Sequence, residues 1–417
     1  MKTLKFIVLL SVFFFTSCSE DEEYIDDYSL TIEATPEEGG TVSPPSGEYK
    51  DGDIISLEAT ASTNYIFVEW NGDISSTDNP YMLTIESSQN INAVFKRHYE
   101  KGYYITNEGP FQNGTGSLTF VGEDDVVDQK VFNTVNNEDL GNIVNSMTLA
   151  GDNAYIIVNN SNKIIVADRY TMEKITTIEG EDVNNPRYII THGNTAYVSN
   201  WGDPLSSSDD FIAIIDLNSN TVTSTISVGE GPENMVIEND NLFVALEGGW
   251  NQNNQVVIID TNTNSITNTV TVGDVPNTIN KDGLGNVWVL CGGNPGWTGN
   301  ETAGSLYKIN AGNFDNTEFE FGLTDHPEHL TSEAGVLYYN LNGKIYGMSS
   351  SSTELPNESM NGFDGFYYNL KAYNGDLYAL DAKDYASEGE LKVFNLGTGT
   401  LLETIETGII PGDIAFQ

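Results

Sequence analysis

The feature that most constrains this chain is a short signature that recurs through its last three quarters. A proline is followed three residues later by an apolar residue at Pro186–Ile189, Pro232–Met235, Pro276–Ile279, Pro327–Leu330 and Pro411–Ile414. The prolines lie 46, 44, 51 and 84 residues apart, and the last interval equals two repeats of 42. Degenerate copies stand at Val144–Met147 and Tyr367–Leu370. Such a period indicates a repeat fold whose units pack on their neighbours.

Each signature begins a unit of short apolar segments. In the clearest unit, strands are predicted at 233–238, 241–246, 255–260 and 265–272. The middle pair recurs in neighbouring units at 195–199 with 211–216, and at 286–290 with 305–309. Four short strands in about 40–50 residues are typical of a β-propeller blade.

The two ends of the repeat region are complementary. The first unit has only three predicted strands, at 103–106, 117–120 and 129–132, and lacks the innermost one. The chain ends with an extra innermost strand at 412–416. Pairing the two ends closes a ring and removes exposed sheet edges. We therefore predict an all-β protein, with a seven-bladed β-propeller at 103–417 closed by the C-terminal strand and a small β-domain before it.

The N-terminus is predicted to be a targeting segment. Lys2 and Lys5 precede the apolar run 6–15, which is shorter than the about 20 residues of a membrane-spanning helix. Residues 1–17 are thus predicted to be a signal peptide, and the segment through Cys18 resembles a bacterial lipoprotein signal. That resemblance implies lipidation of Cys18, with 18–29 as a lipidated acidic tether. The alternative is an ordinary cleaved signal with an incidental cysteine.

The acidic run 20–23 that follows Cys18 resembles the export signal of Bacteroidota lipoproteins. This resemblance implies an outer-membrane protein that is held by its lipid anchor and faces the cell exterior. The other interpretation is a solvated spacer, because charge runs commonly serve as one.

Residues 30–97 alternate apolar and polar side chains in several short stretches, at 30–34, 54–59, 65–70, 81–85 and 91–95. Alternation of this kind predicts half-buried strands, and the stretch 39–45 is rich in turn residues. The segment resembles the internalin-type B-repeat family through Gly40, Val42, Gly52, Phe67, Trp70, Gly72, Asn79, Pro80, Ala93 and Phe95. We expect a B-repeat-like β-domain with Trp70 in its core.

The repeat region also carries family-like motifs. The segment Val257–Ile266 resembles the YVTN family of surface propellers, and Asn107–Gly109 with Gly116–Leu118 resembles a Bacteroidota branch of that family. Some members of this branch are surface lipoproteins that capture cobalamin and pass it to a TonB-dependent outer-membrane transporter. The resemblance implies a ligand-capture function with such a transporter as partner. A glycan is the other small ligand that we considered.

The candidate ligand site lies on the predicted loops of one face. Five long, Gly-, Asn- or Ser-rich loops between the second and third strands each carry an aromatic residue: Phe111, Trp201, Trp250, Trp297 and Tyr385. The starts of the innermost strands, near the channel mouth on the same face, contribute Arg187, Tyr188, Asn234, Asn277 and His329. Aromatic faces with polar neighbours suit a large, amphipathic ligand. The alternative is that the aromatic side chains seal the blade cores.

Composition argues against several other functions. With 17 basic and 61 acidic residues, the chain has a net charge of −44, so we expect no binding to nucleic acid and no membrane contact beyond the lipid anchor. No phosphate loop, Cys-x-x-Cys or Gly-x-Ser-x-Gly motif occurs, and we expect no enzymatic activity. His326–His329 is interpreted as a blade-entry turn rather than a metal site.

No cofactor is expected, apart from a structural calcium at acidic pairs such as Asp209 and Asp210. Cys291 is expected to be unpaired. Two other functions stay open: a carbohydrate- or protein-binding surface adhesin, and a metal-dependent hydrolase with its metal at the channel mouth.

Overall fold

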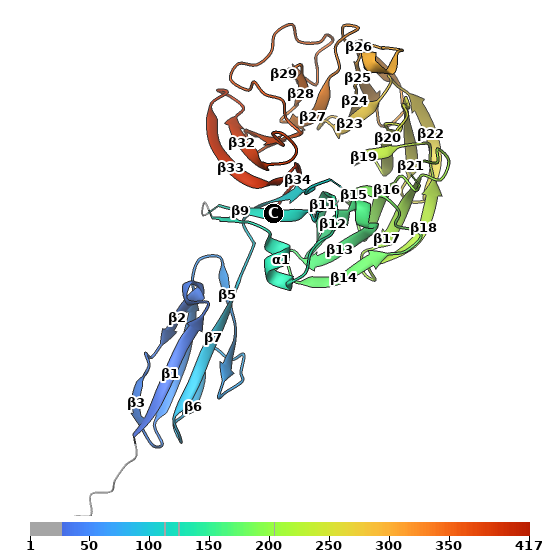
Figure 1. The fold of residues 1–417 in the computed structure, drawn as a ribbon. Coiled ribbons are helices and arrows are strands. Elements are labelled where there is room, and N and C mark those ends of the chain that lie inside the picture. The colour runs from blue at the N-terminus through green and yellow to red at the C-terminus, as the bar shows by residue number, and fades with distance from the viewer. Residues whose placement is uncertain (1–26, 112–113, 124–125, 204) are drawn as a thin grey trace, which may run out of the picture. The chain divides into compact units, whose positions relative to one another are not determined.

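The computed structural model describes residues 27–111, 114–123, 126–203 and 205–417 (Figure 1). The chain divides into two compact units, 1–97 and 98–417. The predicted signal peptide, Cys18 and the acidic run lie outside the described residues. Among the described residues, no helix is long and apolar enough to cross a membrane.

The N-terminal unit consists of two sheets, with strand orders β3-β1-β7-β5 and β2-β4-β6. The strands are β1 (Asp27–Thr35), β2 (Gly40–Ser43), β3 (Gly47–Lys50), β4 (Ile54–Ala61), β5 (Tyr65–Gly72), β6 (Tyr81–Thr84) and β7 (Gln89–Arg97). The short helix η1 (Glu37–Gly39) precedes β2. Part of the stretch predicted as turns is thus the strand β2. Trp70 is fully buried, and its indole N–H donates to the Asp78 carbonyl at 3.0 Å.

The second unit is a ring of seven sheets, which we number as blades 1–7 and describe from the axis outward (Figure 1). Blade 1 comprises β34 (Pro411–Phe416), β8 (Gly102–Asn107), β9 (Ser117–Gly122) and β10 (Val127–Asp128). Blade 2 comprises β11 (Val144–Ala150), β12 (Asn153–Val158), β13 (Lys163–Asp168) and β14 (Lys174–Glu179). Blade 3 comprises β15 (Pro186–His192), β16 (Thr195–Asn200), β17 (Phe211–Asp216) and β18 (Thr221–Ser227).

The other four blades follow in chain order. Blade 4 comprises β19 (Pro232–Glu238), β20 (Asn241–Leu246), β21 (Gln255–Asp260) and β22 (Ser265–Thr271). Blade 5 comprises β23 (Pro276–Lys281), β24 (Asn286–Cys291), β25 (Ser305–Asn310) and β26 (Asn316–Glu320). Blade 6 comprises β27 (Glu328–Glu333), β28 (Val336–Leu341) and β29 (Lys344–Ser349), and blade 7 comprises β30 (Asn369–Tyr373), β31 (Asp376–Asp381), β32 (Glu388–Asn395) and β33 (Leu401–Ile409). This architecture confirms the predicted all-β propeller.

The core lies between adjacent blades. The middle strands β16 and β17 are buried on both faces, so their sequences read as continuous apolar runs rather than alternating ones. One cluster joins blades 3 and 4 by packing Tyr197 and Ile212 against Met235 and Val244. Each blade therefore depends on its neighbours for burial, as expected of a repeat fold.

Blade 1 closes the ring. Its inner strand is as predicted, but its outer strand is not. β34 pairs antiparallel with β8, with Ile414 opposite Ile105, as the complementary ends of the repeat region predicted. The strand predicted at 129–132 is wrong: its place is taken by the two-residue β10 and by helix α1 (Val131–Asn136). The adjacent Val131 and Phe132 are both buried, and a strand would direct consecutive side chains to opposite faces.

Blade 6 has three strands instead of four. Residues 350–368 connect it to blade 7 without a strand. The first part of this connection, 350–361, is rich in Ser and Asn and has no apolar alternation. Farther along, Phe363 and Tyr367 are buried against the Phe394 ring of blade 7.

A candidate ligand-binding site on the propeller axis

The recurring Pro-x-x-apolar signature marks a bulge at the start of the innermost strand. In blade 3, Pro186 is opposite Asn200 and Ile189 is opposite Val198, so that Arg187 and Tyr188 share a single partner position. Register shifts occur at the equivalent place in blades 1, 2, 4, 5 and 6. An extra residue at a bulge re-aims side chains. Residues of these bulges line the axial cavity, together with other residues of the innermost strands and of the loops.

Asparagines at this level tie neighbouring blades together. The Asn145, Asn277 and Asn369 side chains donate to the carbonyls of Arg187, Pro327 and Gly412 on the next blade, at 2.7, 3.0 and 2.7 Å. Asn234 in the bulge of blade 4 makes no such bond to any described residue. Three asparagines are thus structural clamps, whereas the Asn234 amide faces the cavity without a partner.

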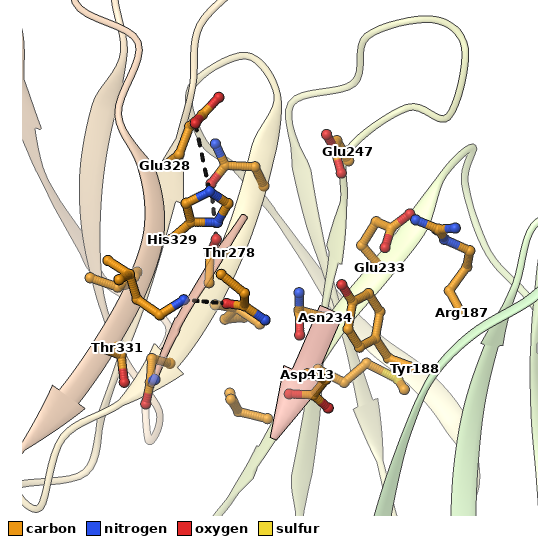
Figure 2. Close-up of a pocket in the computed structure, with 18 of the residues that line it drawn as sticks. Arg187, Tyr188, Glu233, Asn234, Glu247, Thr278, Glu328, His329, Thr331 and Asp413 are labelled. Atoms are coloured by element: carbon orange, nitrogen blue, oxygen red, sulfur yellow. Dashed lines mark hydrogen bonds and ion pairs between the residues drawn. The ribbon is translucent and has the colours of Figure 1, made fainter. Parts of the chain in front are cut away.

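The cavity on the axis has a volume of about 1210 Å³ and is lined by the innermost strands and the loops above them. Ligand pockets typically measure about 300–1,000 Å³, so this cavity admits a large ligand or a large part of one. Figure 2 shows Glu247 and Glu328 at one end of it and Asp413 at the other.

Arg187 is held on both sides at the cavity wall. Its Nε atom donates to Glu233 Oε1 at 2.8 Å, and the Glu233 side chain is only 3% exposed. The guanidinium carbon lies 4.4 Å from the centre of the Trp201 ring, within cation–π range. Burial raises the pKa of Glu233, and Arg187 opposes that shift. The charge of Arg187 is therefore already used within the protein.

Two further carboxyl groups at this end have raised pKa values. Burial and the nearby Glu233 carboxylate raise the pKa of Glu247 to about 8. Burial also raises the pKa of Glu108, and a 2.7 Å hydrogen bond from the Tyr368 hydroxyl opposes this. With a pKa of about 8, the Glu247 carboxyl exchanges its proton near neutral pH, so a bound charge controls its ionisation.

His329 lies in the bulge of blade 6 and lines the same cavity. Burial lowers its pKa to about 4, so the imidazole is neutral at pH 7. Its backbone φ of 60° lies in the left-handed region, which costs energy for a residue other than glycine. The neighbouring His326 bonds the Gly292 carbonyl through Nδ1 at 2.7 Å.

The predicted site residues fall into two groups. Seven of the ten line the cavity, and these are Arg187, Tyr188, Asn234, Asn277, Trp297, His329 and Tyr385. Phe111 and Trp250 do not line it, although they are 67% and 71% exposed. Trp201 does not line it either: it is half-buried, and its indole N–H donates to the Pro232 carbonyl at 3.2 Å. Trp201 packs against Arg187 and is not the free loop-tip aromatic that the sequence suggested.

None of the acidic lining residues was predicted from the sequence, and they include Glu108, Glu233, Glu247, Glu328 and Asp413. The signature itself could have found Glu233 and Glu328, because each directly follows the proline that opens a bulge. Glu247, directly after β20, has no comparable signal.

The described residues include no group of three or more His, Cys, Asp or Glu side chains arranged to hold a metal ion. Asp209 and Asp210, considered for calcium, each accept a backbone amide, from their own loop and from the loop before β19 respectively, and Asp210 Oδ1 is buried without a partner among the described residues. Asp209 accepts the Asp203 amide at 2.9 Å, and Asp210 accepts the Gly231 amide at 2.6 Å. Cys291 is a free, buried thiol.

Structural comparison supports the fold alone. The computationally designed Ika8 protein has a TM-score of 0.52 and 9% identity, over 77% of this chain and 92% of that one. BamB from Moraxella catarrhalis has a TM-score of 0.48 and 14% identity, and the match covers 75% of this chain and 85% of BamB. Hydrazine synthase of Kuenenia stuttgartiensis has a TM-score of 0.49 and 16% identity, and the match covers 70% of this chain and 90% of that one.

Family profiles match residues in both units. No curated protein sequence matches this chain. The divergent InlB B-repeat domain matches residues 30–98, in agreement with the resemblance noted for this segment. A family described as a domain of unknown function, DUF5074, matches residues 101–362, which is more than half of the chain and covers blades 1–6 apart from the closing strand. The chain therefore belongs to the DUF5074 family.

Proposed function

We propose that this protein captures a large polar organic ligand in the axial cavity of its propeller. The observation that carries the proposal is the cavity of about 1210 Å³, into which the bulges of several blades direct polar side chains. Exposed rings at its rim, Trp297 and Tyr385, add apolar contact area. A concave site with convergent polar groups and perturbed carboxyl groups is the usual form of a ligand site.

Cobalamin is the first ligand to test, because the motifs at Asn107–Gly109 and Gly116–Leu118 resemble a branch of YVTN-type propellers of which some members capture it. Titration calorimetry with the purified protein should show saturable binding. Asn234→Trp, which places a bulky indole in the cavity, should abolish that binding. Thr225→Trp on the exposed strand β18 is the matched control and should leave it unchanged. Binding that survives Asn234→Trp would place the ligand elsewhere, and glycans are the next class to titrate.

We further propose that lipidated Cys18 anchors the protein to the outer face of the outer membrane, where it passes its ligand to a TonB-dependent transporter. Support comes from the lipoprotein-like signal and the acidic run after Cys18. Cys18→Ala should release the protein from membranes in cell fractionation. Alanine at residues 20–23 should retain lipidation but protect the protein from protease added to intact cells. Protection of the unaltered protein would contradict the surface location.

A further inference from the structure

The cavity is rich in hydrogen-bond acceptors that have no partner. Glu233 uses Oε1 for Arg187, and its Oε2 has no hydrogen-bond partner among the described residues, although the side chain is only 3% exposed. The side chains of Asn234 and Glu247 likewise have no partner in the described part of the chain and line the same cavity. Glu233 is buried, whereas Asn234 and Glu247 are partly exposed to the cavity, so a ligand group that supplies N–H bonds here can pair with all three.

The positive side chains around the cavity are already paired. Lys281 lies 3.3 Å from Glu238, and Lys371 lies 3.7 Å from Asp413. Arg187 is engaged by Glu233 and the Trp201 ring. None of these three cations pairs with Glu247 or Glu328 in the described structure. The carboxyl groups of Glu247 and Glu328 are therefore left for a ligand to pair with.

Glu247 and Glu328 lie at the same end of the cavity, above Asn234 (Figure 2). Glu328 lies 3.6 Å from the His329 imidazole, which is neutral at pH 7, and His326 is a second neighbour that acts on this carboxyl. The net charge of −44 adds a negative potential around the whole protein, which attracts cations and repels anions. Charge, acceptor chemistry and position thus favour the same kind of ligand group.

We propose that the ligand carries an organic cation, an ammonium or guanidinium group, that binds at Glu247 with Glu233, Asn234 and Glu328 around it. This inference rests on the proposed function and names the chemistry of that site. The cation supplies the N–H donors that these acceptors lack, and the aromatic rim residues Trp297 and Tyr385 contact the rest of the ligand.

The cation also changes the ionisation of Glu247. The charged and titratable groups that face this carboxyl are Glu233, Arg187, Tyr188 and Glu328. In the free protein the pKa of Glu247 is about 8, so the group is largely protonated at pH 7. A bound cation favours the ionised form, so binding releases a proton. Affinity for a cation should therefore rise with pH up to about 8 and then level off.

The test compares phenethylammonium with its neutral analogue 2-phenylethanol, using calorimetric titration of the purified protein. The ammonium should bind at least about tenfold more tightly. Glu247→Gln should remove most of this difference and abolish the pH dependence of ammonium binding between about pH 6 and about pH 9, where the probe stays charged. Glu181→Gln is the control, because Glu181 is an exposed carboxylate in a loop that does not line the cavity.

The possible failures can be told apart. Equal affinity for the alcohol and the ammonium, or a preference that survives Glu247→Gln, overturns the cation inference while leaving the cavity as a ligand site. Absence of ammonium binding also overturns the inference. The proposed function is tested separately by Asn234→Trp with a larger ligand, and it fails if that variant still binds.

Discussion

Two layers of the propeller contribute to the same face, and they are built differently. The inner layer consists of bulge residues such as Arg187 and Glu233, fixed by ion pairing and by hydrogen bonds between blades. The outer layer is a rim of loop aromatics, of which Trp250 is 71% and Trp297 is 83% exposed. If the cavity binds a ligand as proposed, the rigid inner layer is expected to select chemical groups, whereas the loop residues add contact area that is easily altered.

Removal of the closing strand is expected to have the largest effect. Deleting residues 410–417 removes β34, exposes the edge of β8 and opens the ring. The free energy of unfolding should fall by at least about 5 kcal/mol, well beyond a typical point substitution. Chemical denaturation measures this loss, and replacing residues 351–354 of the strandless blade 6 connection by Gly-Ser repeats is the control. An unchanged denaturation midpoint would disprove closure by this strand.

Breaking one ion pair of the inner layer is expected to lower the free energy of unfolding by less than deletion of the closing strand does. Arg187→Ala leaves the Glu233 carboxylate buried without its partner, which should destabilise the protein by about 3 kcal/mol. Glu233→Gln in the same chain should restore part of the loss, because it removes the unpaired charge. Trp250→Ala in the rim should change stability by less than about 0.5 kcal/mol. Equal losses for the Arg187 and Trp250 variants would remove the distinction between the layers.

The rim should affect binding without affecting folding. Trp297 lines the cavity and Trp250 does not, although both are exposed indoles on loops of the same face. Trp297→Ala should weaken ligand binding by about 1–3 kcal/mol with an unchanged melting temperature. Trp250→Ala should leave both quantities unchanged. If both variants lose affinity equally, the ligand extends over the rim rather than entering the cavity.

Much of the fold follows from sequence because its pattern is local and repeated. The apolar runs of β16, β20 and β24 and the recurring prolines define the blades and their order. The prediction was wrong at 129–132, where tertiary burial of Val131 and Phe132 favours a helix turn. The missing fourth strand of blade 6 is likewise a tertiary effect, because Phe363 is buried against the Phe394 ring of the next blade.

Less of the candidate site than of the fold could be predicted from the sequence. Loop aromatics are visible in the sequence, but their contacts are not: Trp201 stacks on Arg187 instead of facing a ligand. The acidic lining was missed because glutamates are abundant in this chain, and apart from its place after Pro232 only burial distinguishes Glu233 from its exposed counterparts. That burial comes from the convergence of blades far apart along the chain.

The central claim is that the axial cavity is the ligand site. Its most direct test is a crystal structure of the protein saturated with the first ligand that titration identifies. The account predicts ligand density on the axis, with a hydrogen-bond donor of the ligand at Glu247 and its remainder against Trp297. Ligand density on the outer strands of the blades, or on the N-terminal unit with the cavity empty, would contradict it.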